Sequence, residues 1–336
     1  MPNEIQLPPW TQPGWFERVC VWIEQQLAGQ NIALQGQIGQ PYRRPWSTVL
    51  RVPTNEGALF FKATTSIFAH EPPLTETLAN WWPDCMPEVL ASDLAQGWLL
   101  LRDAGQPLRS RIQADQTIDG WLTVLPRYAD IQRELAERVD ALLAFGLPDR
   151  RPAGLLTQYE DLLADRDALL LDQPDGLSRE EYRQLQAMVP QVAAMADQVA
   201  EIGLPDTLHH DDFHDANIFV RADRITFTDW GECCLGHPFY TMVIVLRSAA
   251  YQLKLAEDDP ALNRLRDAYL EPWTTMTSRA ALLAGFRPAH RLGMLCRTLT
   301  WYQFVQSLAE PERSEYAEAV PGWLQEFLGG RLVASE

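Results

Sequence analysis

Residues 210–231 read HDDFHDANIFVRADRITFTDWG and contain two short apolar runs separated by a polar turn. The first run covers residues 218–220 and the second covers residues 225–227. Apolar runs joined by so short a turn predict an antiparallel β-hairpin. The residues just outside the two ends of this hairpin are polar, and they carry the chemistry of the segment.

Antiparallel pairing brings the residues outside the two ends of a hairpin side by side. Asp212 and Asn217 are therefore expected near Asp229. Two carboxylates and an amide oxygen suit Mg²⁺, a hard cation that takes oxygen ligands and is usually completed by substrate phosphates. The order His-x-Asp-x₄-Asn, hairpin, Asp-x-Gly also matches the phosphoryl-transfer template, in which the first Asp accepts the proton of the attacking hydroxyl.

The segment resembles the aminoglycoside phosphotransferase and choline kinase-like family, whose members are relatives of the protein kinases. Members commonly carry a His-Gly-Asp-x-His-x-x-Asn loop and then Asp-Trp-Gly. The matching residues here are His210, Asp212, His214, Asn217, Asp229, Trp230 and Gly231. Asp211 stands where glycine is usual and adds a charge beside Asp212. The resemblance implies ATP as phosphoryl donor, Asp212 as catalytic base, and Asn217 and Asp229 as ligands of Mg²⁺.

The first hundred residues contain five apolar runs that predict strands, at 32–37, 47–52, 58–63, 88–92 and 98–102. The third run ends near Lys62, whose ammonium needs an anion or solvent because an unpaired buried charge is costly. A helix is expected over residues 71–82. The resemblance implies that Lys62 holds the α- and β-phosphates of ATP and that Glu71 holds Lys62. Glu76, in the middle of the same helix, is the alternative partner.

The resemblance also places a phosphate-covering loop between Gly36 and Thr48. The spaced glycines of a protein-kinase loop are absent from this stretch. Gly36 and Gly39 are the candidates for a tight turn, and Ser47 or Thr48 is the candidate hydrogen-bond donor to a phosphate.

Residues 101–105 resemble the hinge between the two lobes of the family fold. Backbone N–H and C=O groups exposed there would contact the edge of the adenine ring. Arg102 and Ala104 are the candidates for this contact.

Apolar residues at helical spacing predict helices over 15–27, 121–145, 155–171, 179–202, 239–253, 261–273, 289–308 and 320–328. With the resemblance, this pattern predicts an α+β, bilobal protein-kinase-like fold. Residues 1–103 would form an N-terminal nucleotide-binding lobe with a five-stranded antiparallel sheet and a helix. Residues 104–336 would form a larger, mainly helical C-terminal lobe with the catalytic loop and the acceptor site.

The composition and net charge of this 336-residue chain limit the kinds of partner that we expect. A net charge of −17 argues against a nucleic-acid partner, since phosphate backbones attract the opposite sign. The charge is compatible with a cationic acceptor without identifying one. The amino-terminal sequence lacks the pattern of a signal peptide, no apolar run is long enough to span a membrane, and the five cysteines have no metal-ligand spacing. We expect a cytoplasmic protein without a membrane partner.

Together these features predict an ATP- and Mg²⁺-dependent phosphotransferase, a small-molecule kinase that acts on a hydroxyl group. The acceptor is left open: aminoglycosides, choline or ethanolamine, homoserine, sugars and macrolides are phosphorylated by proteins that look similar. Aromatic residues near the carboxyl end could cage a quaternary amine, although aromatics at helical spacing usually form core. They are Trp273, Trp301, Tyr302, Phe304 and Trp323.

Two other function classes remain open. One is a catalytically impaired nucleotide-binding regulator of the same fold, suggested by the glycine-poor loop and by Thr241, which stands where the family commonly has an aspartate. The other is a metal-dependent phosphohydrolase with imidazole and carboxylate ligands. Its ligands would come from His209, His210, Asp211, Asp212, His214 and Asp215.

Overall fold

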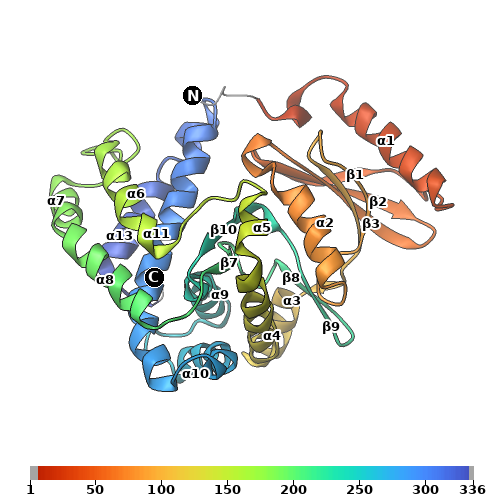
Figure 1. Cartoon of the computed structure of the whole chain (residues 1–336). Helices are drawn as coiled ribbons and strands as arrows, with labels where there is room; N and C mark the ends of the chain where they lie inside the picture. The colour runs from red at the N-terminus through yellow and green to blue at the C-terminus, as the bar shows by residue number, and fades with distance from the viewer. Residues whose placement is uncertain (1–6, 333–336) are drawn as a thin grey trace. The chain divides into compact units, whose positions relative to one another are not determined.

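The computed structural model describes residues 7–332, which fold into two compact units (Figure 1). Among these residues, unit 1 comprises 7–106, 218–231 and 307–312. Unit 2 comprises 107–217, 232–306 and 313–332. The predicted hairpin therefore belongs to the same unit as the first hundred residues, while the His-rich loop before it belongs to unit 2.

Unit 1 contains a five-stranded antiparallel sheet with the strand order β1-β2-β3-β5-β4. The strands are β1 (Gly39–Arg43), β2 (Ser47–Thr54), β3 (Gly57–Thr64), β4 (Val89–Asp93) and β5 (Trp98–Arg102). In the register of β3 against its neighbours, Lys62 lies opposite Val49 and Leu99. Because successive residues of a strand point to opposite faces, Phe61 and Lys62 face opposite sides of the sheet.

One face of this sheet is covered by helix α1 (Trp15–Gly29), as its sequence pattern predicts. Its buried residues recur every fourth position and form one apolar stripe. They are Trp15, Val19, Ile23 and Leu27. This stripe packs with Phe61, Val52 and other strand residues, and burial of each such side chain contributes about 1.5–3 kcal/mol. Lys62 is thereby directed to the other face.

Helix α2 (Glu71–Trp81) confirms the helix predicted over residues 71–82. Pro72 and Pro73 occupy its first turn, where the missing N–H groups have no intrahelical partner to lose. Leu74 and Leu78 are fully buried, one turn apart. Three short 3₁₀ helices complete the helical elements of this unit: η1 (Pro9–Thr11), η2 (Ser66–Phe68) and η4 (Trp230–Glu232), the last of which ends in unit 2.

The first of the five predicted strands is wrong. Residues 32–37 form only an isolated bridge between Leu34 and Thr54, and the edge strand is β1 instead. Ile32 is buried in the α1 cluster and Leu34 packs against that cluster, so this apolar run marks a core contact. All five residues of β1 are exposed, which removes the alternation by which a strand is recognised. The other four predicted strands are confirmed.

The predicted hairpin is confirmed as β8 (Ile218–Arg221) and β9 (Arg224–Phe227). Ile218 lies opposite Phe227, and the two-residue turn contains Ala222 at a positive φ of 52°, as hairpin turns of this length require. Short strand β6 (Gln106–Pro107) marks the passage of the chain from unit 1 into unit 2.

Unit 2 is mainly helical. Its helices are α3 (Leu108–Asp115), α4 (Asp119–Leu135), α5 (Val139–Leu143), α6 (Pro152–Ala164), α7 (Arg179–Ala187), α8 (Val189–Glu201), α9 (Met242–Leu253), α10 (Pro260–Leu270), α11 (Arg279–Ser307), α12 (Glu312–Tyr316) and α13 (Ala319–Gly329), with 3₁₀ turns η3 (Ala136–Arg138), η5 (Pro238–Thr241) and η6 (Glu271–Thr275). Strands β7 (Thr207–His210) and β10 (Cys233–Gly236) pair antiparallel, with His210 opposite Cys233. Within residues 7–332, no helix combines the length and the apolar character needed to cross a membrane.

The helix predictions fail mainly at their boundaries. The helix predicted over 179–202 is two helices, because Pro190 lies in the first turn of α8 and its ring cannot continue the preceding helix. The helix predicted over 121–145 is likewise broken after Leu135. Helix α11 begins at Arg279, ten residues earlier than predicted. Helix α3 was not predicted, because only two of its residues are buried.

Candidate active site

Lys62 lies between two carboxylates in unit 1. Its Nζ atom is 2.5 Å from Glu71 Oε1 and 2.6 Å from Asp229 Oδ1. The side chain of Glu71 is 2% exposed, whereas that of Asp229 is 48% exposed. Burial alone would lower the pKa of Lys62, but Asp229 and Glu71 outweigh it and raise that pKa above its ordinary value. Lys62 is a fixed cation beside an accessible carboxylate.

Of the two glutamates considered as partners of Lys62, Glu71 makes the contact. Glu76 instead accepts a hydrogen bond from the Ser92 hydroxyl. The difference follows from position, because Glu71 is the first residue of α2 and Glu76 lies five residues further along it.

Gly231 lets the chain after Asp229 pass close to Glu71. A Cβ atom at Gly231 would lie 3.1 Å from Glu71 Oε2 and 3.2 Å from the Phe68 ring, closer than nearly all real Cβ contacts. The Gly231 carbonyl is also 2.7 Å from His70 Nε2. Asp229 itself has a positive φ of 65°, a backbone conformation that is uncommon for residues other than glycine and that often marks functional sites.

In unit 2, three side chains hold Asp212. Arg297 Nη2 is 3.2 Å from Asp212 Oδ1, and His214 Nε2 is 3.3 Å from Asp212 Oδ2. The Asn217 amide nitrogen donates to the Asp212 carbonyl at 3.0 Å and to its Oδ2 at 3.3 Å. The match of this loop to the family motif therefore corresponds to real contacts among the motif residues.

Arg297 lies on helix α11, not in the loop itself, but it contacts the most acids around Asp212. It was not predicted from the sequence. It is 7% exposed, donates to the Asp211 carbonyl at 3.1 Å, and forms ion pairs with Asp212 and Glu232. A buried arginine is costly unless it is paired, so the three acids and the arginine depend on one another. The available signal was a single charged residue within the otherwise uncharged run 292–300.

The charges around Asp212 decide its protonation. Burial alone would raise the pKa of this carboxyl, but Arg297, followed by His214 and His210, holds it well below the ordinary value. Asp212 is therefore an anion at neutral pH, with both oxygens oriented by neighbouring donors.

His209 compensates the extra charge of Asp211. Its Nε2 is 2.9 Å from Asp211 Oδ1 and its Nδ1 is 2.9 Å from the Thr241 hydroxyl. Burial alone would lower the pKa of His209, but the bond to Asp211, together with the Cys296 thiol, raises it to about 9. Thr241 thus supports the loop through His209, where the family commonly has a carboxylate.

Replacing Arg297 by methionine is expected to destabilise the fold. The change removes the cation that pairs with Asp212 and Glu232, whose side chains are 22% and 13% exposed, and breaking such a largely buried ion pair costs up to roughly 3–5 kcal/mol. Urea unfolding measures the loss. The control is Arg183→Met, because the pair of Arg183 with Glu180 is exposed and contributes about 0–1 kcal/mol. Equal unfolding free energies for the two variants would contradict a structural role of Arg297.

The stability contributed by His209 is expected to depend on pH. The pKa of His209 in the folded chain is about 9, above its ordinary value of 6.5, so the contribution is complete below pH 6.5 and is lost as the pH rises through about 9. The unfolding free energies of the wild type and His209→Gln should therefore converge between pH 6.5 and 10, by at most about 3 kcal/mol. His237→Gln is the control, since burial and His209 lower the pKa of His237 to about 3 and it stays neutral over this range. A pH-independent difference for His209→Gln would contradict a protonated His209.

The predicted phosphate loop has a different geometry from the one expected. The turn between β1 and β2 lies at residues 44–46, closed by the Arg44 N–H donating to the Ser47 carbonyl, so Gly36 and Gly39 lie before or at the start of β1 and do not form it. The Thr48 hydroxyl is engaged by the Tyr42 carbonyl and the Gln40 amide. Ser47 begins β2 and is buried, and its contact with a phosphate stays a prediction.

Of the two hinge candidates for the adenine contact, Arg102 already has its backbone N–H and its side chain bonded to other residues. The Arg102 N–H donates to the Glu88 carbonyl at 3.0 Å, and the Arg102 side chain pairs with Glu56 and Glu88. These groups of Arg102 are therefore committed within unit 1. The contact between Ala104 and an adenine ring stays a prediction.

The two predicted magnesium ligands, Asn217 of unit 2 and Asp229 of unit 1, stay a prediction. The Asn217 amide nitrogen points to Asp212, so its oxygen is turned away from that carboxylate. Asp229 uses Oδ1 for Lys62, and its half-exposed side chain presents its second oxygen. Carboxylate and amide oxygens fit Mg²⁺.

The histidines and carboxylates that the phosphohydrolase hypothesis requires as metal ligands have separate partners in the structure. Asp215 pairs with Arg109, His214 with Asp212, and His209 with Thr241 and Asp211. Within residues 7–332, the group of ligand atoms close enough to share a metal ion is His209, Cys234 and Cys296, all of them buried. The histidines and carboxylates of the loop therefore do not converge on one point.

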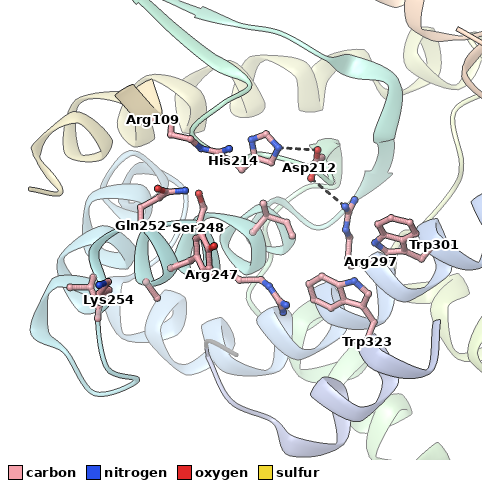
Figure 2. A pocket seen from close by; sticks show the side chains of 14 residues that line it. Arg109, Asp212, His214, Arg247, Ser248, Gln252, Lys254, Arg297, Trp301 and Trp323 are labelled. Carbon is pink, nitrogen blue, oxygen red and sulfur yellow. Dashed lines mark hydrogen bonds and ion pairs between the residues drawn. The ribbon is translucent and has the colours of Figure 1, made fainter. Parts of the chain in front are cut away.

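Asp212 lies in the wall of a cavity of about 850 Å³ within unit 2, here called the Asp212 pocket (Figure 2). Helix α9 contributes Arg247, Ser248 and Gln252 to this pocket, and α11 contributes Arg297 and Trp301. Cavities of 300–1,000 Å³ suit small-molecule ligands. A small molecule bound here would have a fixed carboxylate beside it.

Comparison with protein-family models matches residues 86–282, more than half of the chain, to the model described as "Phosphotransferase enzyme family". No curated protein sequence matches the chain.

Several solved structures have a similar fold. Plasmodium vivax ethanolamine kinase has a TM-score of 0.60 at 11% identity, with 94% of this chain and 89% of that chain covered. A choline/ethanolamine kinase family protein from Mesorhizobium loti has a TM-score of 0.58 at 15% identity, with coverages of 88% and 89%. Choline kinase from Cryptosporidium parvum has a TM-score of 0.57 at 12% identity, with coverages of 95% and 91%. The bilobal, protein-kinase-like fold predicted from the sequence is thereby confirmed.

Proposed function

We propose that this chain, which belongs to the phosphotransferase enzyme family, transfers the terminal phosphoryl group of ATP to a hydroxyl group of a small molecule. The observation that carries the proposal is Asp212, an anion held by Arg297, His214 and Asn217 in the wall of the Asp212 pocket. The similar fold of structures named as choline and ethanolamine kinases supports a hydroxyl acceptor.

The chemical step needs little covalent participation by the protein. The acceptor oxygen forms a bond to the γ-phosphorus, the bond from that phosphorus to the β,γ-bridging oxygen breaks, and ADP leaves. Asp212 accepts a hydrogen bond from the acceptor hydroxyl, which aims the oxygen at the phosphorus. Because the pKa of Asp212 is held low, it takes the proton late, once the new P–O bond has made the hydroxyl acidic.

The contacts with the nucleotide phosphates are assigned to Lys62 of unit 1. Lys62 would hold the α- and β-phosphates, with Glu71 fixing the position of its ammonium. Asn217 and Asp229 would hold Mg²⁺, which supplies charge neutralisation on the phosphates when bound. Catalysis by this set rests on positioning and on charge stabilisation.

Thr241, one of the two features that suggested the regulator hypothesis, is part of a hydrogen-bonded support of the catalytic loop. Thr241 is fully buried and bonded to His209, which in turn bonds Asp211, so the loop is supported without the family's aspartate. Support of the loop by a neutral hydroxyl and a histidine gives no reason to expect lost catalysis.

The test is acceptor-dependent ADP formation. The purified chain with ATP and Mg²⁺ is offered amines, amino alcohols, sugars and hydroxy acids, and ADP is measured against a reaction without acceptor. At least one acceptor should raise ADP formation well above that background, and chelation of Mg²⁺ should abolish the increase. A chain that binds no nucleotide in calorimetry and forms no ADP with any acceptor is not a kinase.

A further inference from the structure

The Asp212 pocket is lined by cations, although the chain as a whole has a net charge of −17. Four lining residues are positively charged and one, Asp212, is negatively charged. The four are Arg109, Arg247, Lys254 and Arg297. Asp212 is already paired with Arg297. The lining therefore has no spare carboxylate with which to hold a cationic acceptor.

The two tryptophans of the pocket each have a ring face that is already occupied by a cation of the protein. A quaternary or primary amine bound by aromatics needs an open ring face. The Arg247 guanidinium lies 4.7 Å from the centre of the Trp323 ring, and the Arg297 guanidinium lies 5.5 Å from the centre of the Trp301 ring. Both tryptophans already hold cations of the protein itself. This arrangement gives no support to the possibility that Trp301 and Trp323 cage a quaternary amine.

The acids that fix Arg109 and Arg247 lie outside the lining. Arg109 is 2.7 Å from Asp215, which is fully buried, and Arg247 pairs with Glu326. A guanidinium has five N–H donors in a rigid fork, so one carboxylate partner leaves donors for a ligand while it holds the group in place. The arginines are thus prepared for a bound anion, and their positions need not change.

Lys254 is the cation of the pocket that lacks an internal partner. It is exposed and makes no ion pair with any residue between 7 and 332. It follows α9, which presents Arg247, Ser248 and Gln252 along one helix face to the same cavity (Figure 2). The Ser248 hydroxyl is buried there without a hydrogen-bond partner among the described residues.

We propose that the acceptor is a hydroxyl compound that carries an anionic group, a carboxylate or a phosphate. Cations of the lining, among them Arg247, Lys254 and Arg109, hold this group, and Gln252 binds a polar atom of the ligand. The assignment rests on the proposed function, because it describes the acceptor side of the same site. It also separates this chain from relatives that are named for choline or ethanolamine.

The first test uses two sets of related acceptors whose members differ in one substituent, which is neutral, cationic or anionic. D-glucose, D-glucosamine, D-glucuronate and D-glucose 6-phosphate form one set, and glycerol, 3-amino-1,2-propanediol, D-glycerate and glycerol 3-phosphate form another. At constant ionic strength, the carboxylate or phosphate member should have a kcat/KM at least tenfold above the neutral and amine members of its set. The two anionic members distinguish the two sources of charge. A preference for the amines, or equal values throughout, overturns the proposal.

The second test detects binding of the anionic acceptors at Lys254 directly, without relying on catalysis. Lys62 and Lys254 are the only lysines in the chain, so protein made with ¹³C-labelled lysine gives two sets of side-chain signals. The variant Lys254→Gln assigns them. Anionic members should shift the Lys254 signals and Mg-ATP should shift those of Lys62. If the anions shift Lys254 while no acceptor is turned over, the anion site stands and the kinase function fails; if no anion shifts Lys254, the anion site fails whatever the activity.

A third test measures how substitutions of the pocket cations change the affinity for the anionic acceptors. Lys254→Glu should weaken binding of the anionic members at least tenfold, and Arg247→Gln should weaken it to a similar extent. Arg183→Glu makes the same change of two charges at an exposed position outside the pocket and serves as the matched control. An equal loss in the control and in Lys254→Glu would mean that only net charge matters, and it would overturn the assignment.

Discussion

Asp212→Asn is expected to lower kcat by about a thousandfold, within the range that a positioned acid or base supplies. The amide keeps the size of the side chain, but it cannot take the proton of the acceptor and it presents an N–H to one of its present donors. The affinity for Mg-ATP should change little, because the nucleotide contacts are assigned to Lys62 and its partners. Steady-state ADP formation and calorimetry with Mg-ATP measure the two quantities.

The control for this variant is Asp223→Asn, which removes one negative charge from the exposed hairpin turn. It should retain wild-type kcat. A turnover of Asp212→Asn within threefold of the wild type would remove Asp212 from the mechanism. A large loss of Mg-ATP affinity would show instead that the substitution disturbs the nucleotide site.

Lys62→Met is expected to weaken Mg-ATP binding by at least about tenfold, a loss of 1.4 kcal/mol or more. The substitution also leaves Glu71 buried without its cation, which costs roughly 3 kcal/mol of stability. A double variant separates these effects. Lys62→Met with Glu71→Gln should recover much of the stability in urea unfolding and should still bind Mg-ATP weakly.

Lys254→Met is the matched control, since it removes the only other lysine of the chain. Its affinity for Mg-ATP should equal that of the wild type. Recovery of nucleotide affinity in the Lys62/Glu71 double variant would mean that Lys62 acts through stability alone. Such a result would remove it from the phosphate contacts.

The parts of the site that could be predicted from sequence depend on short-range patterns. The hairpin between Asn217 and Asp229 follows from two apolar runs and a two-residue turn, and its register is fixed by the turn length. A lysine near the end of an apolar strand needs an anion or solvent, but it was the resemblance to the family that singled out Lys62 and implied Glu71 as its partner.

The parts that could not be predicted depend on tertiary contacts between distant segments. Arg297 lies eighty-five residues after Asp212, and the apolar helix around it gives no hint of which acid it meets. The edge strand β1 is fully exposed and lacks any alternation. Similarly, a helical pattern identifies α9 but does not reveal that Arg247 and Lys254 share a cavity with Asp212.

The contacts of Asp211 have an evolutionary consequence. Its carboxylate lies where the family commonly has glycine, and it is held by His209 and Arg297. A homologue in which glycine occupies this position no longer needs a protonated imidazole at position 209, whereas Arg297 is still required by Asp212. Positions 209 and 211 should therefore mutate together across descendants of a common ancestor, while position 297 remains invariant.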